Sequence, residues 1–230
     1  MNKISKLLLA SLVLFSMTGC VVYHPQLADV PLVEHKGDTR VAASLHFLSG
    51  PGLSTTISTG LTDHLAAQVH ASFDGPDVFY THMAVGLYLP HEKGVFETYL
   101  GLGRGNGDVY IDADPASARG PYMCHFLQFN YGWKLSEKST IGVSFKGGTL
   151  WPHVRWSGSV YSAASDSWIF ESGIDNDVHA LLEPQFFYRV GNERLKFQIQ
   201  LGYSYVGFPR DIRALRYSPL SLSTGVSINL

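Results

Sequence analysis

Residues 195–205 read LKFQIQLGYSY, and this stretch decides the fold. Its odd positions hold Leu, Phe, Ile, Leu, Tyr and Tyr, and its even positions hold Lys, Gln, Gln, Gly and Ser. Strict alternation of apolar and polar residues predicts a β-strand with one face in an apolar environment and the other face in a polar environment. The stretch is also long enough to cross a bilayer when tilted. We therefore expect its apolar face to meet lipid and its polar face to line an interior.

Other segments of the mature chain repeat this alternation. Together they predict strands at residues 39–48, 52–61, 64–73, 79–89, 95–103, 122–134, 140–150, 180–190, 195–205 and 220–230. Short polar turns alternate strictly with longer connections, the longest at residues 104–121, 151–179 and 206–219. Outer-membrane barrels are built in this way, with tight periplasmic turns and longer external loops. An even number of strands would place both chain ends on the periplasmic side.

The pattern predicts an all-β protein, a single antiparallel up-and-down transmembrane β-barrel of about ten strands over residues 39–230. Such a sheet must close because unpaired backbone groups cannot lie in lipid. An eight-stranded barrel with one segment folded into a loop, and a soluble periplasmic β-sandwich on a lipid tether, are the alternatives. Pro184 conflicts with the eighth segment because proline cannot donate to a ladder, so we expect a later strand start or a bulge there.

The composition agrees with a membrane barrel. Charged residues make up 16% of the chain, against roughly 25% in a typical soluble domain. The formal net charge is −2 and the sequence has no basic patch, so we expect no nucleic-acid partner. No apolar run of the length that a membrane-spanning helix needs follows the N-terminal leader.

Residues 1–19 are typical of a lipoprotein signal peptide. Lys3 and Lys6 precede an apolar core at residues 7–15 that is too short to span a membrane. The MTGC stretch at residues 17–20 resembles a bacterial lipobox, with Met17 in place of the more usual Leu. The resemblance implies cleavage before Cys20 and its acylation by palmitate-type chains, several of which together give stable anchoring.

Residues 20–38 are expected to form a lipidated tether. The segment contains proline and glycine and has little periodicity, which predicts an extended linker between the lipid and the first strand. The lipid on Cys20 is expected at the periplasmic side of a Gram-negative outer membrane. The other cysteine, Cys124, is then expected to be a free thiol.

Short motifs in the first half of the mature chain resemble those of a known family. They are Cys20 with YHP at 23–25, VPL at 30–32, KGD at 36–38, TDH at 62–64, and KGVFE at 93–97 running into GLGRG at 101–105. These motifs are similar to those of small outer-membrane β-barrel lipoproteins of the Bacteroidetes type, and the second half matches only by pattern. The resemblance implies the barrel fold and the outer-membrane location, but no established activity and no catalytic residues.

Three histidines are expected to face the interior. His70 and His82 should lie opposite each other across one hairpin, with His46 two strands earlier, so they are weak candidates for a metal site, which needs convergent ligands. A polar interior network is the alternative we favour, without metal or cofactor. His70 and Ser72 also resemble the His-x-Ser pairing of outer-membrane lipid A deacylases. That chemistry requires the pair to meet lipid, whereas the alternation of inward and outward positions along the strand places both residues on the interior face.

Charged residues also fall on the predicted interior face, namely Glu97, Lys146, Glu183 and Arg189. Enclosed charges are normally paired, which predicts a polar network. A small barrel usually fills its interior with side chains, so we expect a filled lumen, with a narrow pore as one alternative. An envelope lipid-modifying enzyme of the deacylase or acyltransferase kind is the other.

The longest predicted loop, at residues 151–179, is rich in aromatic side chains. Trp151 and Trp156 could join an interfacial aromatic girdle, and Tyr161 and Trp168 could form a recognition surface. We therefore expect a structural or surface-interaction role. The expected partners are membrane lipids and an extracellular or envelope protein or glycan that the loops contact.

Overall fold

The computed structural model describes residues 22–23, 27, 30–47, 51–75, 77–111, 116–162, 165–207 and 219–230. Over these ranges the chain forms one sheet of 13 strands. They are β1 (Thr39–Phe47), β2 (Gly52–Gly60), β3 (Leu65–Gly75), β4 (Val78–His91), β5 (Gly94–Ile111), β6 (Ala116–Ser136), β7 (Ser139–Pro152), β8 (Val154–Ser162), β9 (Ser167–Asp175), β10 (His179–Gly191), β11 (Leu195–Tyr203), β12 (Tyr205–Gly207) and β13 (Leu220–Asn229). No helix of these described ranges is long and apolar enough to cross a membrane.

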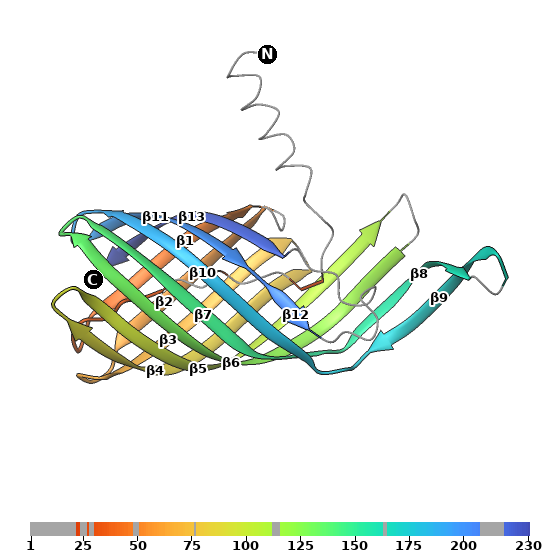
Figure 1. Cartoon of the computed structure of the whole chain (residues 1–230), viewed down its shortest axis with the longest axis horizontal. Coiled ribbons are helices and arrows are strands. Elements are labelled where there is room, and N and C mark those ends of the chain that lie inside the picture. The colour runs from red at the N-terminus through yellow and green to blue at the C-terminus, as the bar shows by residue number, and fades with distance from the viewer. Residues whose placement is uncertain are drawn as a thin grey trace, which may run out of the picture.

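Ten of these strands close into a barrel (Figure 1). Each pairs antiparallel with the next in the order β1, β2, β3, β4, β5, β6, β7, β10, β11, β13. The ring is completed by β13 and β1, whose ladder runs from Arg40 opposite Asn229 to Phe47 opposite Leu222. The prediction of a ten-stranded barrel is confirmed, and the eight-stranded and β-sandwich alternatives are wrong.

Apolar side chains cover the outside of the barrel, and its inside holds polar side chains together with a cluster of buried aromatic and aliphatic ones. In β11, Phe197 and Ile199 are 58% and 48% exposed, whereas Gln198 and Gln200 are 4% and 1% exposed. The two faces predicted from the opening stretch are therefore confirmed over the whole of β11. A continuous apolar surface of this kind on a closed barrel is suited to the hydrocarbon of a bilayer.

Two of the predicted loops contain strands. Most of residues 104–121 continues β5 and β6, and residues 151–179 hold the β8–β9 hairpin. These extensions reach beyond the barrel on its loop side, at the right of Figure 1. The prediction failed here because strands above the membrane need no apolar outer face, so the alternation of apolar residues stops while the backbone pairing continues.

Pro184 neither delays β10 nor introduces a bulge, so both expectations for it were wrong. The strand begins at His179 and pairs with β7 in an unbroken register that includes Pro184 opposite Phe145. On its other edge, pairing stops after Gln185 opposite Gly202 and resumes with β12. The missing N–H of the proline is accommodated by this short break between β11 and β12.

Candidate functional site

The segment that precedes β1 lies inside the barrel. Val22, Tyr23 and Val30 have no exposed surface, and Leu27 and Val33 are almost as buried. Val22 and Tyr23 belong to the cluster of buried apolar residues inside the barrel. The described residues of the predicted tether up to Val33 thus lie in the lumen, a location that nothing in its sequence pattern predicts.

Glycines of the barrel wall make room for this segment. A Cβ atom at Gly107 in β5 would overlap the backbone of Val22. Equivalent atoms at Gly132 in β6 and at Gly202 in β11 would overlap the side chains of Leu32 and Leu27, respectively. Interiors are packed without spare volume, so these three strands fit closely around the segment only because they lack side chains at the points of contact.

The buried carboxylate of Glu183, in β10, holds the start of the segment. Its carboxylate forms a buried ion pair with Lys146 and accepts hydrogen bonds from the hydroxyls of Tyr23, at 2.8 Å, and Ser204, at 2.7 Å. The Lys146 ammonium also lies 5.5 Å from the ring centre of Phe126. The carboxylate is therefore both neutralised and hydrogen-bonded, as a buried charge requires.

Nearer the turn end, Arg189 and Glu97 hold the backbone of the segment. Arg189 donates hydrogen bonds to the carbonyl oxygen of Val30 and to Oε1 of Gln198, the latter at 3.1 Å. Glu97 accepts a hydrogen bond from the backbone N–H of Val33 at 2.8 Å. All four charged residues predicted to line the lumen are buried on its inner face, and three of them bind the N-terminal segment.

Arg40 is a further luminal charge that was not singled out from the sequence. It donates hydrogen bonds to Ser227 at 2.7 Å, to Gln198 at 3.3 Å and to the carbonyl oxygen of Pro31 at 3.4 Å. The strand alternation could have found it, because Val41 faces lipid and its neighbour must face inward.

These contacts follow the barrel from its loop end to its turn end. Val22 lies beside Gly107, near the top of β5, whereas Val33 bonds to Glu97, near the bottom of the same strand. The segment then leaves the lumen, and the N–H of Gly37 donates to the carbonyl of Gly60 at 2.8 Å. The N-terminal segment thus runs the length of the lumen before β1 begins.

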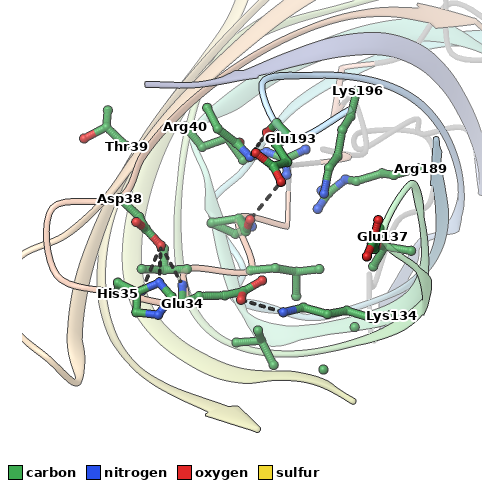
Figure 2. Close-up of a pocket in the computed structure, with 18 of the residues that line it drawn as sticks. Glu34, His35, Asp38, Thr39, Arg40, Lys134, Glu137, Arg189, Glu193 and Lys196 are labelled. Atoms are coloured by element: carbon green, nitrogen blue, oxygen red, sulfur yellow. Dashed lines mark hydrogen bonds and ion pairs between the residues drawn. The ribbon is translucent and has the colours of Figure 1, made fainter. Parts of the chain in front are cut away.

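A cavity of about 610 Å³ opens at the turn end of the barrel. In Figure 2, Lys134 reaches Glu34 while Arg189 and Lys196 extend from the barrel wall around the cavity. Acidic side chains from Glu34, Asp38, Glu137 and Glu193 share the lining with basic ones. The floor includes residues 31–33 of the N-terminal segment, so the cavity is a vestibule of mixed charge in front of the filled lumen.

Two of the three interior histidines, His70 and His46, are hydrogen-bonded to the wall, whereas His82 packs against neighbouring rings. The rings of His70 and His82 stack with centroids 4.9 Å apart. His70 is hydrogen-bonded to Thr56 at 2.8 Å, and His46 to Ser54 at 2.6 Å. Among the described residues, no group of three or more His, Cys, Asp or Glu side chains is placed to hold a metal ion.

The His-x-Ser pair lies on the lumen face, as parity predicts. His70 and Ser72 are each 1% exposed, and the lipid-facing position between them is Ala71. A lipid chain on the outer surface therefore does not meet either side chain. The geometry of a deacylase, which needs the nucleophile or its base at the lipid surface, is not formed here.

Another buried histidine, His179, pairs with the carboxylate of Asp175 at the loop end. His179 Nε2 lies 3.0 Å from Asp175 Oδ2, and sequence reasoning missed this pair because the two residues flank the turn from β9 to β10. A carboxylate can orient an imidazole for proton transfer. The two side chains are only 1% and 8% exposed, however, so the pair fastens the start of β10 and is closed to a substrate.

The aromatic side chains between positions 151 and 179 lie in different environments. Trp151 lies on the outer face at the end of β7, as a girdle residue would, whereas Trp156 packs against the interior cluster. Trp168 in β9 is 70% exposed. The backbone of Tyr161 pairs with Trp168, but its side chain lies outside the described part of the structure. Cys20 lies outside the described residues as well.

Comparisons with known proteins bear on the fold. The chain is similar to the Escherichia coli outer membrane protease OmpT, with a TM-score of 0.54 and 7% sequence identity over 85% of this chain and 94% of that one. The loop L8 deletion mutant of OmpT, an outer membrane protein of Vibrio cholerae, is 8% identical over 84% of this chain and 98% of that one, but its TM-score of 0.24 carries no argument. No protein-family model and no curated protein matches the chain. The first likeness shows an outer-membrane barrel fold.

Proposed function

We propose that the protein is an acylated outer-membrane barrel whose lumen is closed by its own N-terminal segment and which acts by surface interaction at its loop end. One observation carries this proposal. Tyr23 and Val30 are bonded to Glu183 and Arg189 of β10, and Val33 is bonded to Glu97 of β5. A lumen filled in this way favours a non-conducting scaffold over a narrow pore.

The anchoring part of the proposal combines two membrane attachments. The apolar outer face of the barrel supports a position in the outer membrane, and the MTGC stretch that ends at Cys20 supports acylation. The likeness of the motifs at residues 23–38 and 93–105 to Bacteroidetes-type barrel lipoproteins supports the same assignment.

The interacting part of the proposal rests on β9. Trp168 and Phe170 are 70% and 64% exposed, and Ile169 between them is 38% exposed, so both faces of the strand present apolar surface. The described sheet ends at β9, which leaves it as an edge strand. A two-stranded ribbon is marginally stable alone, and a partner protein that adds a strand here would cover both the edge and the aromatic side chains.

Enzymatic alternatives have less support. OmpT is a protease, but a likeness at 7% identity concerns the fold alone. The candidate groups of this chain, His70 with Ser72 and His179 with Asp175, are buried away from lipid and from open water. Catalysis requires such groups to reach a substrate, so we do not propose an activity for them.

Site-specific photo-crosslinking in living cells tests the interaction. A photoreactive phenylalanine analogue at Trp168 is expected to give a discrete protein adduct, because this side chain is exposed and projects from an edge strand. The same analogue at Leu201, on the outer face of β11, is the control and should label lipid alone. Absence of any protein adduct at Trp168 and at Phe170, with the barrel folded, would contradict the proposed role.

A further inference from the structure

We infer that acylated Cys20 lies at the loop end of the barrel, so that its acyl chains enter the outer leaflet of the outer membrane. The inference rests on the proposed acylation and changes its location. The sequence led us to expect the lipid on the turn side, with both chain ends. The described residues from Val22 to Val33 run through the lumen and reverse that expectation for the N-terminus.

The level of Val22 along the barrel axis is the first argument. Its backbone lies against Gly107 in β5. The last two apolar residues on the outer face of β5 are Leu100 and Leu102, which are 64% and 59% exposed. The outward positions that follow are polar, namely Arg104, Asn106 and Asp108. Gly107 therefore lies past the end of the apolar belt, and Val22 with it.

The short distance from Val22 to Cys20 is the second argument. A chain extends by at most about 3.6 Å per residue, so two residues span about 7 Å. The apolar band of an outer-membrane barrel is about 25 Å tall. Cys20 therefore cannot reach the opposite leaflet from the position of Val22, whereas the rim on the loop side is within its reach.

The fixed register of the segment is the third argument. Sliding it toward the turn end would separate Tyr23 from Glu183 and would move Leu27 and Leu32 away from the glycines that accommodate them. It would also strip Glu183 of a hydrogen bond inside the lumen, and buried charges that lose their partners are strongly destabilising. The contacts thus hold Val22 at the loop end.

Antibody binding to intact cells tests the inference. A short epitope inserted between Val21 and Val22 is expected to be detected on intact cells, at a level comparable to the same epitope placed in the connection between β8 and β9. The same epitope in the turn between Asn192 and Glu193 is the matched control and should be detected only after the outer membrane is permeabilised.

Labelling with radioactive palmitate, compared between the wild-type chain and Cys20→Ala, is run in parallel. Label that depends on Cys20, with the epitope detected on intact cells, is the expected result. An epitope that behaves like the one in the turn would overturn the inference even if Cys20 is labelled. Absence of Cys20-dependent label would overturn the proposed acylation, and with it the surface lipid, whereas the epitope would still report the path of the segment.

Discussion

Replacing Lys146 with methionine is expected to lower the free energy of unfolding by about 3–5 kcal/mol. Lys146 and Glu183 form an ion pair whose side chains are only 4% and 6% exposed. Methionine keeps most of the side-chain volume but leaves the carboxylate charge without a counter-charge. Its remaining partners, the hydroxyls of Tyr23 and Ser204, donate hydrogen bonds but carry no charge.

Urea unfolding in detergent micelles, followed by heat-modifiable gel migration, measures this loss. Lys134→Met is the matched control, because its ion pair with Glu34 is 41% and 34% exposed and should be worth about 0–1 kcal/mol. The double variant Lys146→Met/Glu183→Gln should recover most of the lost stability, since no unpaired charge remains. A Lys146→Met barrel as stable as the Lys134→Met control would contradict the role of this pair.

Deletion of residues 22–33 is expected to turn a silent barrel into a conducting one. The wild-type protein should give no current steps in planar bilayers, because the segment fills the lumen and is bonded to its wall through Glu183, Arg189 and Glu97. Without the segment, these charged groups would border a water-filled passage. Such a passage would admit ions, as the polar interiors of larger barrels do.

A synthetic peptide of residues 22–33 provides the control for the deletion. Added to the conducting variant, it is expected to block the current, whereas a peptide of scrambled sequence should not. Heat-modifiable migration of the deletion variant shows that the barrel remains folded. Steps of equal size in the wild-type protein would favour the pore, and a folded deletion variant without steps would show that the side chains of the wall alone close the lumen.

The barrel wall could be predicted from the sequence because lipid imposes a period of two on it. Phe197, Ile199 and Leu201 face outward in β11 for that reason, and the inward position of Glu183 and Lys146 follows from the same parity. The turns also fell where the alternation stops. Whether a wall residue faces lipid or the lumen depends on its position in the alternating pattern, so it can be predicted from the residues next to it in the sequence.

The contents and the upper edge of the barrel could not be predicted in this way. A segment such as residues 22–33 contacts several strands at once, so its apolar and polar residues follow no fixed period. The spaces left by Gly107, Gly132 and Gly202 are visible only in the folded barrel. The outward residues of upper β5 face water, so their polar character hid a strand. The His179–Asp175 pair likewise depends on a turn whose geometry the sequence pattern does not specify.

The presence of the N-terminal segment in the lumen is the central claim, and a disulfide between Leu32→Cys and Gly132→Cys tests it most directly. A Cβ atom at position 132 would lie 3.1 Å from Leu32 Cγ, the position that a cysteine sulfur would take. This separation suits a disulfide bond. The Cys124→Ser background removes the buried native thiol, and Leu32→Cys with Gly147→Cys is the control, since a Cβ atom at position 147 has only ordinary contacts, with Leu182 and Phe145 and not with Leu32.

The measurement is gel migration of the folded, unreduced protein compared with the reduced one. The account predicts that the Leu32→Cys/Gly132→Cys chain is cross-linked as isolated from the outer membrane, that reduction reverses the shift, and that the control pair stays unlinked. A folded barrel in which the two thiols of Leu32→Cys/Gly132→Cys remain free, or in which both pairs cross-link equally, would contradict the presence of the segment in the lumen.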